Sequence, residues 1–129
     1  MNIEQLKYPI GKFQTPDSYS PQDISNWISI IENTPAQIEA AVDGLTEEQL
    51  DTPYRPGGWT VRQVVHHLPD SHMNSYIRFK WTLTEDSPVI KAYDERLWGE
   101  LEDGKNAPIE MSVQLLKSLH TRWVVMLKN

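Results

Sequence analysis

The chain has 129 residues, a net charge of −6 at pH 7 and no cysteine. That length suits a single domain built around one hydrophobic core. An acidic balance without any basic cluster argues against nucleic acid or an anionic membrane surface as the main partner. The absence of cysteine excludes a disulfide framework and a zinc–thiolate site, and it fits a cytoplasmic protein. No apolar run approaches the length of a membrane span.

The N-terminal third is predicted to contain an extended arm followed by one long helix. Residues 1–19 hold prolines and no sustained hydrophobic period, which indicates the arm. Ser20 can cap the helix and Pro21 suits its first position. Apolar residues then recur at steps of three and four. Pro35 is expected to kink the helix or split it near 32–34, because its ring blocks the backbone hydrogen bond four residues back.

A second long helix is predicted from Val61 to about Leu83. Before it, Thr46 can cap a short helical turn, and a connection rich in proline and glycine follows. The residues Thr60 and Gln63 fit the capping-box pattern at the start of the long helix. Pro69 lies inside it, so we expect a kink or a lost turn there.

The remaining residues predict a long connection and a third long helix. Residues 86–107 lack a sustained period, although "AYDERLWGEL" within them can form a helical turn or two. Pro108 opens the last helix, whose apolar residues fall on one side. No strand pattern competes with these helices. The sequence therefore predicts an all-α protein, with residues 1–129 forming one helical-bundle domain.

The second predicted helix carries three of the four histidines and has two distinct sides. Its core-facing arc contains Val61, Val65, Leu68, Tyr76, Phe79 and Leu83. Its polar arc contains Gln63, His67, Asp70, Ser71, Asn74 and Arg78. His72 falls on the apolar arc, and His120 lies near the apolar seam of the last helix. We interpret both as hydrogen-bonded structural histidines. By spacing alone, a solvated helix face is the favoured interpretation of the polar arc, since most amphipathic helices have one.

Residue spacing alone identifies no catalytic or metal site. Two histidines on one helix converge on zinc when they are three or four residues apart, whereas His67 and His72 are five apart. The chain contains no His-x-x-x-His pair, no Gly-x-Ser-x-Gly elbow and no glycine-rich phosphate loop. By spacing, the chain is a helical domain with a polar stripe.

A family resemblance adds to this interpretation. The stretch "PGGWTVRQVVHHLPDSHMNSYIRFKWTLTEDSPVIKAYDE" resembles the DinB/YfiT-like family of proposed metal-dependent hydrolases. It is most similar to the YfiT branch, which includes bacillithiol S-transferases. The similarity extends to the first helix and to "LLKSLHTRWVVMLK" near the end. The resemblance implies an up-down four-helix bundle. It also implies a divalent metal, zinc or nickel, held by three histidines with an open position for water.

The resemblance assigns roles to four residues of the polar arc. The first metal ligand of the family follows the Trp-Thr-Val-x-x-Val-Val-x-His pattern, which places it at His67. The other two ligands form a His-x-x-x-His pair on a fourth helix. Neither that pair nor that helix is expected within residues 1–129, so the metal site is expected to be incomplete here. Asp70 and Asn74 are candidates to orient substrate, and Arg78 is a candidate to bind a substrate carboxylate.

Two classes of function follow from the resemblance. The first is a metal-dependent hydrolase or thiol S-transferase acting on a small molecule, with a low-molecular-weight thiol as one candidate substrate. The second is a non-catalytic helical fragment or assembly module, so the sequence leaves open whether this chain is an enzyme. Without a fourth helix, Trp27, Ile31, Leu116 and Trp123 are expected to lack part of their cover. We therefore predict a homodimer.

Overall fold

The computed structural model describes all 129 residues and contains seven helices and no β-strand. The three long helices are α2 (Pro21–Val42), α4 (Val61–Thr84) and α7 (Ile109–Lys128). The four short ones are α1 (Ile3–Lys7), α3 (Glu47–Leu50), α5 (Glu95–Gly99) and α6 (Glu102–Lys105). The predicted all-α class is confirmed, and so are the predicted long helices. None of the helices combines the length and the apolar character that crossing a membrane requires.

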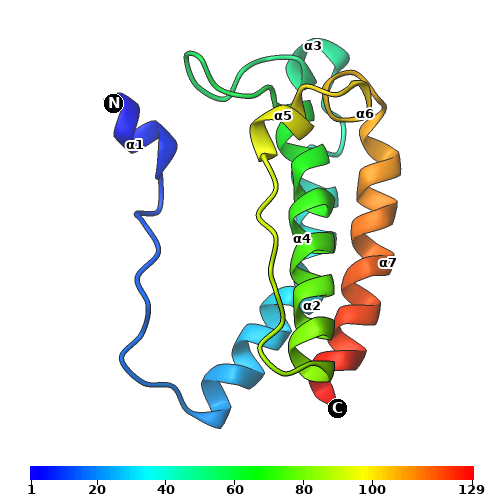
Figure 1. Ribbon diagram of the computed structural model, residues 1–129. Coiled ribbons are helices and arrows are strands. Elements are labelled where there is room, and N and C mark those ends of the chain that lie inside the picture. Colours follow the sequence, from blue (N-terminus) through cyan, green and yellow to red (C-terminus); the bar gives the residue numbers. More distant parts are fainter.

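Helix α7 is the centre of the bundle because it packs against both α4 and α2. Figure 1 shows α4 and α7 side by side, with α3, α5 and α6 gathered at the end of the bundle where α4 begins. The segment that follows α4 runs back along that helix before α5. We call this segment, residues 85–94, the covering segment; it lines a cavity together with Asn74 and Arg78 of the polar arc.

The predicted helix starts are confirmed by capping boxes. The hydroxyls of Ser20, Thr46 and Thr60 each accept a hydrogen bond from the backbone amide three residues later, at 3.1 Å. In α4 the reciprocal bond runs from the Thr60 amide to the Gln63 side-chain oxygen at 3.0 Å. Because these side chains satisfy backbone donors that the first helical turn leaves unpaired, they fix where each helix begins.

The N-terminal arm contains a helix that the sequence analysis missed. Helix α1 is capped by Asn2, which accepts from the Gln5 amide at 2.9 Å while Gln5 returns the bond at 2.9 Å. The helix is only five residues long and buries no side chain. Its apolar residues are too few to produce a helical period, so only the capping pair could have revealed it.

The two internal prolines do not interrupt their helices. Helix α2 continues through Pro35 and α4 continues through Pro69 (Figure 1). The predicted split of the first helix and the predicted lost turn in the second are therefore wrong, whereas the kink expected as the other outcome at each proline stays a prediction. A proline removes one backbone hydrogen bond, whereas the neighbouring bonds and the packing against α7 remain. The carbonyl that Pro35 leaves free, at Ile31, accepts a hydrogen bond from the His120 ring instead.

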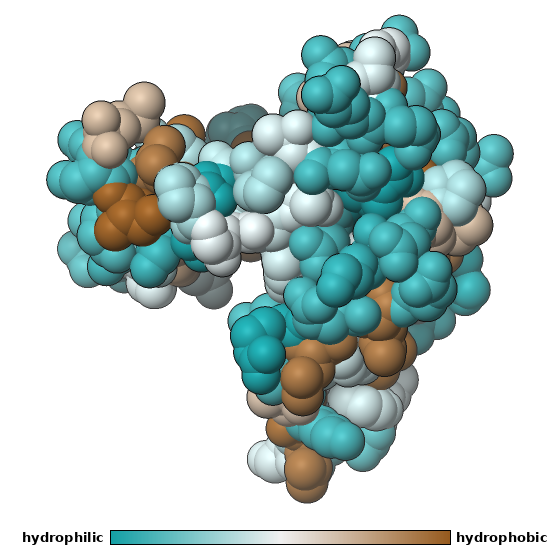
Figure 2. All heavy atoms as spheres, turned by 90° about the horizontal axis from the view of Figure 1, so that it is seen from above, coloured by the Kyte–Doolittle hydropathy of each residue, from teal (hydrophilic) through white to brown (hydrophobic).

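The apolar core lies between α7 and the other elements. Its buried cluster consists of Leu50, Val65, Ile109 and Val113. Further along α7, Leu116 and Trp123 are also buried, at 1% and 6% exposure, so the expectation that both lack cover is wrong. Trp27 on α2 remains 43% exposed. Seen from above, hydrophobic side chains reach the surface on the projecting N-terminal part and on the body (Figure 2).

Candidate functional site

The first turn of α4 is fixed by two buried polar side chains. Arg62 is 3% exposed, and its guanidinium donates to Asp51 at 2.8 Å, to the Ala107 carbonyl at 3.1 Å and to Glu47. The Gln63 amide nitrogen donates to the Gly99 carbonyl at 2.8 Å. Both side chains are otherwise costly to bury, and these bonds satisfy them. They hold α4 against α3, α5 and the start of α7.

His66 has a structural role. Its two ring nitrogens lie 2.6 Å from the Ser112 hydroxyl and 2.7 Å from the Ala107 carbonyl. The ring is 3% exposed. Because a carbonyl only accepts, the nitrogen beside Ala107 carries the proton and the other accepts from Ser112. His66 has no nitrogen left for a ligand.

His67 is the only one of the four histidines whose ring makes no hydrogen bond within the protein. The ring is half-buried and lies against the indole of Trp59, with 4.8 Å between ring centroids. Burial lowers the pKa of His67, and the nearby Glu95 carboxylate offsets part of this effect. At neutral pH the ring is therefore uncharged and keeps a nitrogen lone pair available.

A glycine allows Trp59 to support His67. A Cβ atom at Gly99 would lie 3.1 Å from atoms of the Trp59 indole. That distance is shorter than ordinary van der Waals contact, so a side chain at this position would push the indole away. Gly99 on α5 therefore leaves room for the Trp59 indole in the position where it contacts His67.

Asp70 lies one turn further along α4, beside a small cavity of about 160 Å³ that His66 and Asp103 also line. Burial raises the pKa of the Asp70 carboxyl. Repulsion from Asp103 acts in the same direction and the positive charge that His66 can carry opposes it. The carboxyl makes no hydrogen bond within the protein. It is therefore free to interact with a ligand.

Asn74 and Arg78 line a separate cavity of about 290 Å³ between α4 and the covering segment. The Asn74 amide donates to the Asp70 carbonyl at 2.7 Å, and the Arg78 guanidinium donates to the Lys91 carbonyl at 3.0 Å. The arginine is thus anchored to the segment that covers α4, with further N–H groups uncommitted.

Tyr93, which the sequence analysis did not select, links these parts. It lines the cavity of Asn74 and Arg78 and its ring lies 4.6 Å from that of Trp98. Burial raises the pKa of Tyr93, and a hydrogen bond with Ser71 acts against this. The side chain also lies within the field of Asp70, Glu95 and Arg78. No pattern in the connection marked this tyrosine, because its position depends on how the segment folds back over α4.

His72 and His120 hydrogen-bond to each other, as expected for structural histidines. The Nδ1 atom of His72 lies 2.6 Å from Nε2 of His120, and Nδ1 of His120 lies 2.6 Å from the Ile31 carbonyl oxygen. His120 is 2% exposed, whereas His72 is half-buried. Burial is the main cause that lowers the pKa of His72 to about 4, with repulsion from His120 and His67 adding to it.

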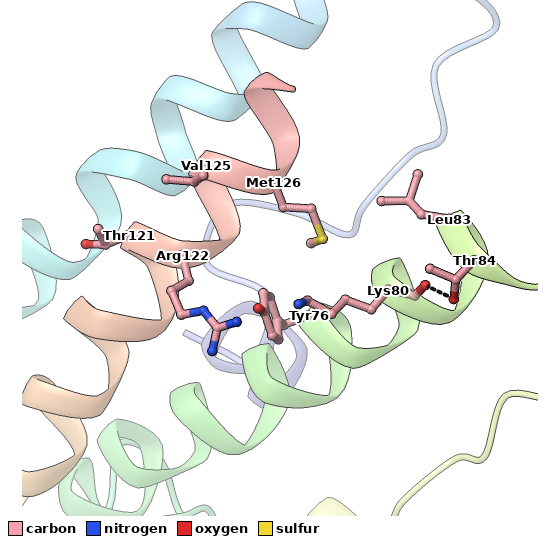
Figure 3. A pocket seen from close by; sticks show the side chains of 8 residues that line it. All are labelled: Tyr76, Lys80, Leu83, Thr84, Thr121, Arg122, Val125 and Met126. Carbon is pink, nitrogen blue, oxygen red and sulfur yellow. Dashed lines mark hydrogen bonds between the residues drawn. The ribbon is translucent and has the colours of Figure 1, made fainter.

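A different groove, of about 420 Å³, lies between the C-terminal ends of α4 and α7. Figure 3 shows the Tyr76 ring between the side chains of Lys80 and Arg122, whose charged groups lie 5.1 and 5.6 Å from the ring centroid. The groove contains no histidine and no carboxylate. It is larger than the cavity beside Arg78, but it offers no group suited to metal or acid–base chemistry, so we do not place the candidate site there.

The residues present do not fit a complete metal site. No group of three or more histidine, cysteine, aspartate or glutamate side chains is arranged to hold a metal ion. The donor set around His67 consists of one imidazole, with Glu95 near enough to affect its charge. A zinc site of the catalytic type needs three protein ligands. Residues 1–129 alone therefore do not form a catalytic metal site.

The fold and this helix face together define a domain of a known class. The DinB superfamily profile matches residues 30–129, and the chain belongs to that superfamily. The predicted family is confirmed.

Relatives from bacteria align with nearly the whole of this chain. A Bacillus subtilis protein with the provisional name metal-dependent hydrolase YfiT is 53% identical over 129 residues, which is 100% of this chain and 72% of that protein. A Geobacillus thermodenitrificans protein, provisionally named a metal-dependent hydrolase, is 50% identical over 127 residues, or 98% of this chain and 71% of that protein.

A solved structure shows the same fold. The chain matches YfiT from Bacillus subtilis with a TM-score of 0.93 and 54% identity, over 96% of this chain and 71% of that one. That protein is described, again provisionally, as a metal-dependent hydrolase with an unusual four-helix bundle topology. The relationship of this chain to a four-helix bundle is confirmed.

Proposed function

We propose that this chain provides the substrate-binding face and one metal ligand, His67, of a metal-dependent hydrolase that acts on a small molecule. The observation that carries the proposal is the state of His67. It alone among the histidines has no protein partner for its ring, although it is half-buried at a fixed position against Trp59. A structural histidine would be expected to use its nitrogens within the fold, as His66 does.

The electrostatics of His67 suit this role. A metal binds the neutral imidazole, and burial favours that form by lowering the pKa of the ring. Imidazole nitrogen is a common ligand of zinc and nickel, so we take a divalent ion of that kind as the cofactor. When bound, such an ion would supply a Lewis acid and would lower the pKa of a bound water or thiol. The site is incomplete within residues 1–129.

The cavity beside Asn74 and Arg78 is where we propose that the substrate lies. Arg78 would bind a carboxylate of the substrate through the N–H groups that its bond to Lys91 leaves free, and Asn74 would orient it. The raised pKa of Asp70 makes that carboxyl a candidate proton carrier at the other side of the helix face. The alternative reaction within this proposal is an S-transfer reaction, in which a low-molecular-weight thiol takes part in place of water.

Nickel titration followed by NMR tests the role of His67. Ni²⁺ is paramagnetic and broadens the ring signals of any histidine that it approaches. We expect broadening at His67, and the loss of that broadening in His67→Ala. His66 and His120 serve as internal controls because both ring nitrogens of each are hydrogen-bonded within the protein. Broadening that spares His67 would contradict the proposal.

Activity assays separate the proposed reactions. Metal-loaded protein would be tested for hydrolysis of small carboxylate-bearing esters and amides, and for transfer of bacillithiol to a fluorescent alkyl halide. We expect Arg78→Ala to raise KM more than it lowers kcat, since it removes a binding contact. Absence of both activities, together with no metal at His67, would favour a non-catalytic helical module. We also propose that the protein acts in the cytoplasm and as a homodimer.

A further inference from the structure

A chain of hydrogen bonds that begins at Pro35 crosses the bundle from α2 to α4. Proline has no backbone N–H, so Pro35 cannot donate to the Ile31 carbonyl as other helical residues would. That carbonyl oxygen lies 2.6 Å from Nδ1 of His120 on α7. The proline thus leaves a buried acceptor that a side chain from another helix uses.

This contact fixes which nitrogen of His120 carries the proton. A carbonyl oxygen only accepts, so Nδ1 of His120 must be the N–H donor. A neutral imidazole has one N–H, which leaves Nε2 of His120 as an acceptor. A doubly protonated His120 would place a charge in a ring that is 2% exposed and makes no contact with a carboxylate. The neutral form with the proton on Nδ1 is therefore assigned.

The same reasoning then fixes His72. Its Nδ1 atom lies 2.6 Å from the acceptor Nε2 of His120, so Nδ1 of His72 is the donor and carries the proton. The Nε2 atom of His72 is left with an unshared lone pair and has no partner within the protein. In water, free histidine favours the other neutral tautomer. The fold thus holds His72 in the less common form.

Aromatic side chains pack against this pair of histidines, and His67 lies near enough to affect the charge of His72. Trp123 packs edge-on against both rings, at 5.9 Å from His72 and 5.5 Å from His120, and Phe79 packs on Trp123 at 5.6 Å. His67 is close enough that its positive charge would repel a proton on His72. The His72 ring is only half-buried, and the one buried polar side-chain atom without a partner is Nε1 of Trp123, so Nε2 of His72 remains open to solvent and to a ligand.

We propose that Nε2 of His72 accepts a hydrogen bond from an O–H or S–H group of the ligand that binds beside His67, with His120 as the positioning residue. This inference rests on the proposed function of the same helix face. The role is that of an acceptor and not of a general base. A group with a pKa of about 4 is a poor proton acceptor near pH 7, where a general base needs a pKa closer to the working pH. A ligand lacking a donor would leave the lone pair desolvated and unpaired.

The tautomer can be measured directly on the wild-type chain. Long-range ¹H–¹⁵N correlation spectra near neutral pH distinguish protonated from unprotonated ring nitrogens. We expect protonated Nδ1 and unprotonated Nε2 in both His72 and His120. Removing the acceptor in His120→Phe should return the proton of His72 to Nε2. A wild-type His72 that carries its proton on Nε2 would overturn the proposal, whether or not the variant folds.

Three matched probes test the ligand. N-acetylcysteamine offers S–H, N-acetylethanolamine offers O–H, and S-methyl-N-acetylcysteamine offers neither. We expect the first two to shift the Nε2 signal of His72 and the methylated probe to leave it unchanged; the responding probe identifies the donor. Equal shifts with all three, or none with any, would overturn the proposed acceptor role.

The results of these tests on His72 can be distinguished from the result of the nickel test of His67. The loss of nickel broadening in His67→Ala reports on His67, whereas the tautomer and probe shifts report on His72. A correct tautomer and probe response without nickel binding at His67 would support the acceptor and refute the metal ligand. Nickel binding at His67 with the wrong His72 tautomer would do the reverse.

Discussion

Trp123 buries an indole N–H that has no acceptor in the fold. The residue is 6% exposed and packs against His72, His120 and Phe79. Most buried donors find a partner, so this one stores an unfavourable desolvation of about 1–3 kcal/mol. The aromatic packing that it provides outweighs that cost, because a buried tryptophan contributes more than its single polar atom loses.

At this residue we predict that Trp123→Phe changes the free energy of unfolding by less than about 1 kcal/mol. The substitution removes the unpaired donor, and the smaller ring loses a similar amount of packing. Trp123→Ala is the matched comparison and should cost about 3–5 kcal/mol, since it leaves a cavity in the core. Urea unfolding of the three proteins measures both differences. Equal losses in the two variants would show that the unpaired N–H is not a liability.

Single residues also show where sequence reasoning reaches its limit. The adjacent histidines His66 and His67 look alike in the sequence, and helical geometry correctly separated them onto different faces. It could not show that His66 is satisfied by Ser112 and the Ala107 carbonyl, because those partners lie more than 40 residues away. The free state of His67 follows only from the folded structure. Its role as a metal ligand remains a prediction from the family resemblance.

At the scale of elements, helix starts were predictable and interruptions were not. Capping boxes at Ser20, Thr46 and Thr60 are local, so four residues suffice to identify each one. The effect of an internal proline depends instead on what packs around it. Pro35 lies in a continuous helix because α7 holds both flanks and His120 uses the freed carbonyl. That compensation comes from a residue 85 positions away.

Two glutamines at the same capping-box position give a matched test of an element. Gln49 and Gln63 both return a bond to the helix cap, but only Gln63 also donates to a buried carbonyl, that of Gly99. We predict that Gln49→Ala costs about 0.5 kcal/mol, in the range of an exposed capping bond. Gln63→Ala should cost about 2 kcal/mol because it also leaves the carbonyl unsatisfied. Denaturant midpoints with unchanged slopes measure the loss of stability in each variant. Similar losses in Gln49→Ala and Gln63→Ala would count against a stabilising role for the bond from Gln63 to the Gly99 carbonyl.

At the scale of the whole molecule, stability should fall as pH drops below neutrality. The pKa of His72 is lowered from 6.5 to about 4 in the folded protein, and that of His67 is lowered too. Between these values the unfolded chain binds more protons than the folded one, so unfolding becomes easier as pH falls. Asp70 has the opposite effect on stability at lower pH. Because its pKa is raised in the folded protein, the folded chain binds the Asp70 proton more readily than the unfolded chain does, and this favours folding as the pH falls.

We predict that the free energy of unfolding decreases by up to about 2 kcal/mol between pH 7 and pH 5 on account of His72. Chemical denaturation at a series of pH values measures the slope. His72→Asn should flatten the profile between pH 6.5 and pH 5, since it removes the group whose pKa differs most between the two states. A variant with an unchanged slope would mean that His72 does not titrate abnormally in the folded protein.

One group of exposed apolar side chains of the molecule lies around the start of α2. Tyr19 and Trp27 pack against each other at 6.0 Å, yet they are 66% and 43% exposed, and Ile30 on the same helix is 61% exposed. Apolar patches of this kind favour association, and tryptophan often dominates an interface. With a charge of −6 on each chain, added salt should strengthen the contact between two chains by screening their repulsion.

We predict a homodimer at tens of micromolar by light scattering, and a monomer for Trp27→Asp. Val89→Asp introduces the same charge at a position that is 90% exposed in the segment after α4, and this control should remain dimeric. A monomeric wild-type chain at that concentration, at low and at moderate salt, would show that this surface does not mediate self-association.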